Sequence, residues 1–318
     1  MMHINIIINQ ILILTILVLT GIIGSRVKVI TATSKDFLAR LIFNITLPSM
    51  LLTNFSRIDL TPRLLSNSLL ILLLSAFVLL FMLFFGWVTS KIFRMKPGEA
   101  GIFKIHSMLG NIIYLGFPVI SALFGKEGLL YASIFTLVSN FLMWTVGVLT
   151  INQGKNISFR KNLLHIINPN TIAIVAGFIM FLASVKLPKL LIDSLGGLGS
   201  TNTYLSMIYI GSVLYFASVG KLLRNKIIYI LSLNRLILVP MILLGIFLLI
   251  NTFLPVKIDP LVCSVLVMQA AMPCMVNVVI MVNILGEDDS LATANVFIST
   301  LLSIITLPII VMLLVFLG

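Results

Sequence analysis

GNIIYLGFPVISALFGKEG, residues 110–128, decides the fold. It is apolar enough to lie in a bilayer, yet Gly110, Gly116 and Pro118 all weaken an α-helix. A second apolar stretch, QAAMPCMVNVVIMVNILGEDD (residues 269–289), is interrupted in a similar way near the other end of the chain. One such helix alone would be interpreted as a simple kink. Two of them predict a pair of broken helices that line an enclosed or wet cavity, because freed peptide groups cannot stay unpaired in hydrocarbon.

The composition of the whole chain agrees with a bilayer environment. Of 318 residues, 60% are hydrophobic and only 9% are charged, and the mean hydropathy is +1.20. Soluble domains carry about 25% charged residues. The long apolar runs show no strand-like alternation, so the sequence predicts an all-α integral membrane protein. The net charge of +12 lies in short clusters between apolar runs, which argues against a nucleic-acid partner.

Cutting the chain at its polar interruptions gives ten expected membrane spans. They are residues 4–24, 37–55, 64–92, 101–123, 129–151, 171–185, 203–220, 227–250, 261–285 and 291–317. Fifteen of the 21 Lys and Arg residues lie in or beside the odd-numbered connections, and six lie in the even ones. The positive-inside rule therefore predicts cytoplasmic odd connections and two extracytoplasmic termini. A multi-pass protein of the cell membrane is expected.

The expected spans divide into two similar halves. FGKEGLLYASIF (residues 124–135) resembles LGEDDSLATANVF (residues 285–297), and each follows an interrupted span. This predicts a first five-helix repeat over residues 1–151, a cytoplasmic connector over 152–170 and a second repeat over 171–318. Because five is odd, the second repeat is inverted, an architecture typical of secondary transporters. Aligning Gly125 with Gly286 places Pro118 opposite Val278.

Several motifs of the chain resemble the auxin efflux carrier family. They are NITLPSMLL (44–52), GNIIYLGFPVISALFGKEGLLYA (110–132), NPNTIAIVAG (168–177), AMPCMVN (271–277) and LATANVFISTLLSIITLPI (291–309). The short central connection is similar to that of the bacterial members often named for malate, which are related to the plant PIN carriers. The resemblance implies ten spans in two inverted five-helix repeats. It also implies that the fourth and ninth helices cross as broken helices at the substrate site and that substrates bear carboxylates. A dimer is usual for the plant relatives of known structure, so a homodimer is a possible assembly.

The candidate binding residues lie around the two expected breaks. The resemblance places the first break at Pro118, with Asn111 before it, and the second half keeps an earlier proline, Pro273. Backbone N–H groups near Pro118 and near Asn277 and Val278 would hold a carboxylate, since helix N-termini favour anions. Asn111 and Asn277 are expected side-chain donors. The weaker candidates are Asn54, Ser139 and Asn140.

Coupling to an ion is left open by the sequence. None of the nine Asp and Glu residues falls in the middle of an expected span, where a proton or sodium carrier usually keeps one. His106, before the first break, and Asp36, at the start of the second span, are the proton-coupling candidates. Arg235 is interpreted as a cytoplasmic anchor whose charged end reaches the membrane surface. The segment 186–199 is expected to lie on the outer surface as an amphipathic linker.

The favoured hypothesis is a secondary active carrier of small organic anions such as malate, working by alternating access. The alternative is a sodium- or proton-coupled carrier of another solute class on the same architecture. An integral membrane enzyme is less favoured, because the three His residues are widely separated and no metal-ligand spacing occurs. No cofactor and no metal are expected. A channel would need a polar stripe or a filter motif, and ATP-driven transport would need a glycine-rich phosphate loop.

Overall fold

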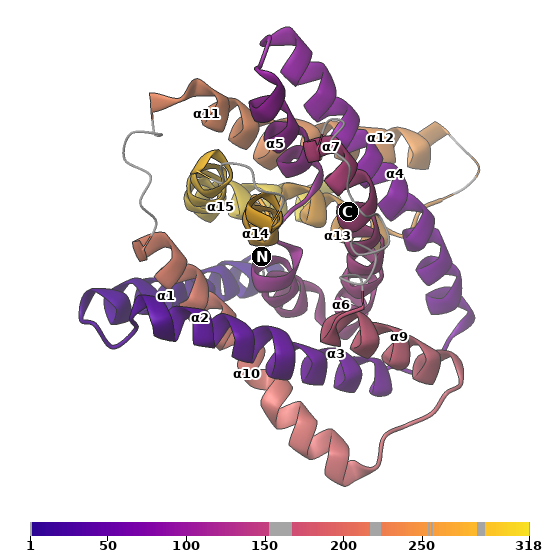
Figure 1. The fold of residues 1–318 in the computed structure, drawn as a ribbon. Helices are drawn as coiled ribbons and strands as arrows, with labels where there is room; N and C mark the ends of the chain where they lie inside the picture. The colour runs from indigo at the N-terminus through magenta and orange to yellow at the C-terminus, as the bar shows by residue number, and fades with distance from the viewer. Residues whose placement is uncertain are drawn as a thin grey trace. The chain divides into compact units, whose positions relative to one another are not determined.

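The computed structural model describes residues 2–152, 167–216, 224–253, 255, 257–284 and 290–317. Every element in these ranges is helical (Figure 1). The α-helices are α1 (Met2–Arg26), α2 (Ala32–Leu41), α3 (Leu47–Ser56), α4 (Pro62–Ile92), α5 (Pro97–Met108), α6 (Phe117–Leu142), α7 (Val148–Asn152), α9 (Pro169–Leu182), α10 (Lys189–Phe216), α11 (Lys226–Leu233), α12 (Val239–Phe253), α13 (Pro260–Ala271), α14 (Val276–Ile284) and α15 (Ser290–Leu317). Four π-helical turns join some of them, namely η1 (Ile42–Thr46), η2 (Ile112–Gly116), η3 (Met143–Gly147) and η5 (Asn234–Leu238).

Five helical segments are long and apolar enough to cross a membrane. They are Ala32–Ser56, Pro62–Ile92, Ile112–Ile151, Lys226–Phe253 and Ser290–Leu314, and shorter apolar helices accompany them. The described residues of the expected spans lie mostly in helices. The all-helical membrane class is therefore confirmed. Most of the expected connector, residues 153–166, and the acidic connection at 286–289 lie outside the described residues.

Local sequence signals explain where several helices begin. Asn168 accepts hydrogen bonds from the N–H groups of Asn170 and Thr171 at the start of α9. Asp259 caps α13 in the same manner. Helices α5, α9 and α13 each have a proline in the first turn, where the missing N–H costs no hydrogen bond. The apolar helices thus start at recognisable polar or proline positions.

The chain forms two compact units, each made of separate segments. Unit 1 comprises Met1–Ile71, Ile113–Leu137 and Ile166–Phe216, and unit 2 comprises Leu72–Ile112, Val138–His165 and Ala217–Gly318. In unit 1, α10 packs along α1 and α3, and α3 packs on α9 (Figure 1). In unit 2, α15 packs against α5, α11, α13 and α14.

The segment before the seventh expected span differs from the prediction. Residues from Lys189 onward belong to α10, which continues as one helix of 28 residues to Phe216. The expected surface linker is thus largely the first part of a long helix. Its three glycines, Gly196, Gly197 and Gly199, resemble a loop in sequence, but Gly196 and Gly199 sit where neighbouring groups approach closely. A Cβ atom at Gly199 would lie 2.7 Å from the Cα of Met50.

Helices α1 and α10 approach each other through two glycines. A Cβ atom built on Gly211 would lie 2.0 Å from the carbonyl oxygen of Val18, and one built on Gly21 would lie 2.1 Å from that of Ile208. Such distances are far below van der Waals contact. Small residues let membrane helices pack closely where lipid offers little hydrophobic driving force. The two glycines therefore set the spacing of this helix pair.

We predict that Gly211→Ala lowers the melting temperature of the purified protein by several degrees, because the new methyl group forces α10 away from α1. Gly197→Ala in the same helix is the control, since nothing lies within 4 Å of its Cβ position. It should be neutral or slightly stabilising, as alanine favours a helix over glycine by about 1 kcal/mol. Equal melting temperatures for the two variants would contradict the close packing of α1 and α10.

Candidate functional site

The two interrupted segments meet at a short backbone pairing within unit 2. Helix α5 ends at Met108 and α13 ends at Ala271. Gly110 and Cys274, in the following residues, form an isolated antiparallel bridge. The Asn111 N–H donates to the Pro273 carbonyl at 2.7 Å, and the Met275 N–H donates to the Leu109 carbonyl at 3.3 Å. The peptide groups freed by one break are thus satisfied by the other, as a low-dielectric environment requires. We call residues 109–111 and 272–275 the two breaks.

The first break differs from the prediction, and the second lies at the earlier of its candidate positions. Pro118 lies within α6 and Val278 lies within α14, so neither residue is at a break. Proline is tolerated at Pro118 because the π-helical turn η2 precedes it, and such local adjustments compensate for a lost helical hydrogen bond. Pro273, by contrast, lies in the second break, and its carbonyl is one of the acceptors there. The helix is next interrupted at Gly125, whose φ of 62° favours glycine.

Arg235 lies at the breaks and is the residue that sequence reasoning misplaced. It is 1% exposed, not an anchor at the membrane surface. Its Nε donates to the Met272 carbonyl at 2.6 Å. Its Nη1 donates to the carbonyls of His106 at 2.8 Å and Ser107 at 2.7 Å. The guanidinium therefore joins the C-terminal end of α5 to the C-terminal end of α13.

The π-helical turn η5 positions this arginine. Asn234, its neighbour in the turn, is also buried and donates from Nδ2 to Thr89 Oγ1 at 2.7 Å. Gly110 supplies the space, because a Cβ atom there would lie 2.2 Å from Arg235 Nη2. π-Helical turns inside α-helices occur frequently at functional sites. The turn, the glycine and the three carbonyls together fix one orientation of the guanidinium.

No carboxylate balances the charge of Arg235 in the part of the chain that the structure describes. None of the Asp and Glu residues there is buried, and none pairs with this guanidinium. The partners are instead helix C-terminal carbonyls, each end carrying about half a negative charge from the helix dipole. Two such ends amount to about one negative charge, which matches one guanidinium. Arg235 is thus the counter-charge of both C-terminal ends.

The N-terminal ends that follow the breaks receive no such counter-charge from Arg235. The helical segments beginning at Ile112 and at Val276 start directly after the paired residues. The first N–H groups of a helix lack intrahelical acceptors and carry partial positive charge. Here the Ile112 N–H donates to the Gly110 carbonyl at 2.8 Å and the Val278 N–H to the Met275 carbonyl at 3.2 Å, which leaves the N–H groups of Val276 and Asn277 for a ligand. Asn277, in the first turn of α14, is partly accessible, whereas its neighbours Met275 and Val278 are buried. The arrangement suits a negatively charged ligand at the start of α14.

Helix α15 supports the second break through polar contacts. Ser299 Oγ accepts a hydrogen bond from the Cys274 N–H at 2.9 Å and donates to the Asn295 carbonyl at 2.6 Å. His106 is fully buried and contacts the Met275 carbonyl through Nε2 and the Asn295 amide nitrogen through Nδ1, both at 3.3 Å. These partners fit a neutral imidazole with its proton on Nε2, a tautomer assigned from the network. His106 therefore links α5 to the second break and to α15.

Gln269 is a further residue of this region that the sequence reasoning did not single out. It lies in the last turn of α13, is 1% exposed, and neither of its amide atoms has a hydrogen-bond partner among the described residues. An unsatisfied buried amide is costly and requires an explanation such as a ligand or water. The sequence does contain a feature that points to Gln269, because this residue begins the interrupted stretch 269–289 and is polar within an apolar helix.

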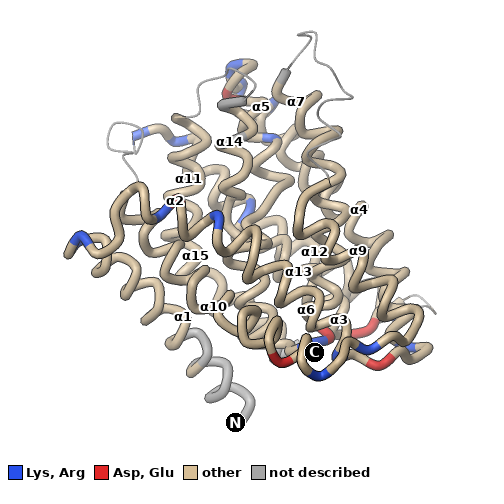
Figure 2. The backbone as a smooth tube through the Cα atoms, turned by 60° about the horizontal axis from the view of Figure 1, so that its bottom comes forward, with Lys and Arg blue, Asp and Glu red and all other residues tan. Residues whose placement is uncertain are grey.

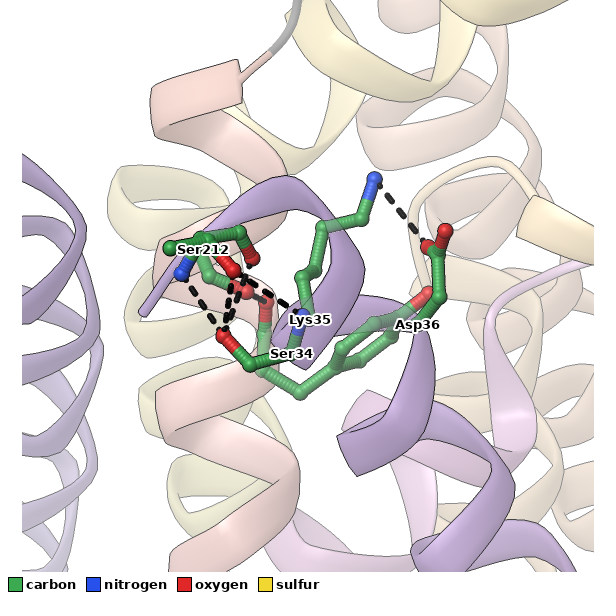
Figure 3. Close-up of polar contacts among 6 residues, drawn as sticks. Ser34, Lys35, Asp36 and Ser212 are labelled. Carbon is green, nitrogen blue, oxygen red and sulfur yellow. Dashed lines mark hydrogen bonds and ion pairs between the residues drawn. The ribbon is translucent and has the colours of Figure 1, made fainter. Parts of the chain in front are cut away.

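The other predicted residues are distributed over both units. Asn111 and Asn140 are buried in unit 2, and Ser139 Oγ has no partner in the described part of the chain. Asn54 is in unit 1 and donates to the Lys126 carbonyl at 3.2 Å. Asp36 is also in unit 1, where its side chain is 64% exposed and pairs with Lys35 at 3.5 Å (Figure 3). The structure thus brings Asn111, Pro273 and His106 together around the breaks.

We predict that Gly110→Ala lowers the melting temperature by several degrees. The methyl group would displace the Arg235 guanidinium and leave buried carbonyls without a donor, at a cost of about 1–3 kcal/mol for each. Gly147→Ala in the same unit is the control, because its Cβ position is 3.5 Å from the nearest atom. A Gly110→Ala protein as stable as the control would show that the guanidinium does not pack against this glycine.

Comparison with known proteins identifies the family of the chain. The family model described as "Membrane transport protein" matches residues 6–158 and 154–311. An uncharacterized transporter of Methanocaldococcus jannaschii is 25% identical over 311 residues, which cover 94% of this chain and 96% of that protein. An uncharacterized transporter of Methanothermobacter thermautotrophicus is 25% identical over 298 residues, covering 92% and 93%. The chain is therefore a multi-pass membrane transporter and belongs to the membrane transport protein family, that of the auxin efflux carriers.

Proposed function

We propose that the protein is a secondary active carrier of small organic anions, with a carboxylate held at the two breaks. The observation that carries this proposal is the buried guanidinium of Arg235 on the carbonyls of Met272, His106 and Ser107. It neutralises the negative ends of α5 and α13. The positive ends of the helices after the breaks are then left for a ligand of opposite sign.

The charge of the ligand follows from the same reasoning. Two helix N-termini carry about half a positive charge each, so one carboxylate balances both. Backbone N–H groups at the start of α14 would bind the carboxylate, with the side chain of Asn277 as a donor. The amides of Asn111 and Gln269 would hydrogen-bond the rest of a polar substrate. Malate and other small carboxylates fit this set of donors.

The carrier mechanism rests on an inverted repeat of two five-helix halves, residues 1–151 and 171–318, joined by a connector over 152–170. The lengths of the interrupted helices support this division. Both α5 and α13 begin with a proline in the first turn and run for 12 residues before the break. Repeats of this kind permit alternating access by movement of one part against another around a central site. The ten spans would lie in the cell membrane, with both termini outside.

A coupling cation at the breaks is not required in this proposal. In other carriers, C-terminal ends of broken helices coordinate sodium or protons. Here Arg235 already occupies those carbonyls as a fixed cation. A sodium- or proton-coupled carrier of another solute would need a membrane carboxylate, and none of the described carboxylates is buried. His106 stays the candidate for proton coupling because it contacts the second break, whereas Asp36 is exposed.

We predict that Arg235→Met abolishes gradient-driven uptake of labelled carboxylates in proteoliposomes, by more than tenfold, because three carbonyls lose their donor and both C-terminal ends lose their counter-charge. Arg235→Lys should retain part of the activity, since it keeps the charge without the planar fork. Arg224→Met is the control, as Arg224 is exposed just before α11. Wild-type initial rates should be equal in sodium and potassium media.

Loss of folding would complicate the result for Arg235→Met, so Asn277→Ala serves as a second variant. It should lower uptake at least several-fold while its melting temperature stays at the wild-type value, because Asn277 is partly accessible and outside the paired residues. Normal uptake by Asn277→Ala and Arg235→Met would remove the breaks as the substrate site. Sodium-stimulated wild-type uptake would refute the role of Arg235 as the fixed cation.

A further inference from the structure

Unit 1 contains a cavity of about 470 Å³ that none of the preceding residues at the breaks lines. Its walls come from α1, α3, the first part of α6 and α10. The volume lies within the range of about 300–1,000 Å³ that is usual for small-molecule sites. The polar lining includes Thr53, Asn54, Ser200 and Thr203, and Leu14 and Leu17 of α1 add apolar surface. A small molecule with a polar end and a short apolar body fits this lining.

The charge of the cavity is entirely positive. Among the residues that the structure describes, Arg57 and Lys126 line it and no Asp or Glu does. The nearby acids have partners of their own, as Asp59 pairs with Lys186 at 2.7 Å and Glu127 pairs with Arg63 at 4.0 Å. Neither Arg57 nor Lys126 forms an ion pair within the described residues. Figure 2 shows basic and acidic positions gathered near the end of α3.

The pKa of Asp59 shows the effect of Lys186 and, to a smaller extent, of Lys126. It lies below the ordinary value, first because Lys186 donates a hydrogen bond to the carboxylate and then because of the charge of Lys186, with a further effect from Lys126. The charge of Lys126 therefore acts on groups at this end of unit 1 even in contact with solvent. It would act likewise on an anion inside the cavity.

Contacts with neighbouring helices position the Arg57 guanidinium and the backbone of Lys126. Arg57 Nη2 donates to the Ile192 carbonyl at 3.3 Å. A Cβ atom at Gly196 would lie 2.6 Å from the same Nη2, so the glycine provides the space for the guanidinium. Asn54 Nδ2 donates to the Lys126 carbonyl at 3.2 Å and fixes the backbone of that lysine relative to α3. An arginine held in one position suits a carboxylate, which it binds through two parallel hydrogen bonds.

We propose that this cavity is a second anion site, which binds a small carboxylate. The proposal deepens the proposed function, because it assigns the cavity to the same class of substrate. Arg57 and Lys126 are exposed to solvent, so their field is screened by salt and acts mainly on the rate of association. Binding at the cavity is therefore expected to be weaker than at the breaks and to decline as ionic strength rises.

The test measures the electrostatic potential of the cavity directly. Ser200→Cys, in the cavity wall, is modified in a non-ionic detergent with an anionic sulfonatoethyl or a cationic trimethylammonioethyl methanethiosulfonate. Thr201→Cys is the control, because Thr201 is exposed on the same helix and does not line the cavity. The two native cysteines, Cys263 and Cys274, are buried and belong to unit 2. The ratio of anionic to cationic modification rates should be several-fold higher at Ser200→Cys.

Two further measurements test the role of the two cations and the class of the ligand. Adding Arg57→Gln and Lys126→Gln should bring the ratio at Ser200→Cys down to that of the control. Malate or another small carboxylate should slow modification at Ser200→Cys and not at Thr201→Cys, with no anionic lipid present. Equal ratios at the two cysteines, or a ratio unchanged by the double substitution, would overturn the proposal. Slowing by added phosphatidylglycerol but by no carboxylate would overturn it as well, by assigning the cavity to lipid headgroups.

These readouts do not depend on transport, so the two proposals fail separately. If carboxylates protect Ser200→Cys but the wild-type protein shows no carboxylate uptake, the cavity site stands and the proposed function fails. If the wild-type protein transports carboxylates without the charge preference at Ser200→Cys, the proposed function stands and the second site fails.

Discussion

The contact between the Arg235 guanidinium and three main-chain carbonyls is the interaction on which the site depends. Burying a charge in a membrane protein costs several kcal/mol unless good hydrogen bonds satisfy it. Breaking two helices in the same environment also leaves carbonyls that need donors. In this protein the free carbonyls at the C-terminal ends of α5 and α13 accept hydrogen bonds from the buried guanidinium. The same bonds therefore satisfy both the carbonyls and the charge. The backbone pairing between Gly110 and Cys274 then satisfies much of what remains.

This contact gives the breaks an unequal distribution of charge. The negative ends of the broken helices are occupied by a covalently attached cation, and the positive ends are not. A carrier that must coordinate a diffusible cation would keep those carbonyls available, as sodium-coupled carriers do. The main reason to propose an anion site is therefore the position of Arg235. The polar side chains at the start of α14 are a smaller part of the argument. The cavity in unit 1 has the same sign of charge for an independent reason, since Arg57 and Lys126 line it and no acid does.

The sequence predicted the class of the protein and the two interrupted helices, because composition and the Gly and Pro residues report directly on bilayer length and helix continuity. It misplaced the first break, at Pro118, whereas Pro273, one of the candidates for the second break, does lie there. Pro118 is the most conspicuous residue of its stretch, yet a preceding π-helical turn accommodates it, and only the backbone shows this. The sequence predicts Arg235 at the membrane surface, because the guanidinium of an arginine near the start of an apolar span usually extends to the aqueous interface. Its true partners are carbonyls 37 and more residues away, and no local pattern contains that information. Gln269 was visible as a polar residue in an apolar helix, but its lack of partners required the packed structure.

The central claim is that an anion binds at the helix N-termini after the breaks while Arg235 stays on the carbonyls. The most direct test is an experimental structure determined with a brominated carboxylate, using the anomalous signal of bromine to locate the ligand. The account predicts one ligand whose carboxylate lies within hydrogen-bonding distance of the backbone N–H groups of Val276 and Asn277, with Arg235 still bound to Met272, His106 and Ser107. A ligand located away from both breaks, or a carboxylate bound by Arg235 in place of those carbonyls, would contradict it.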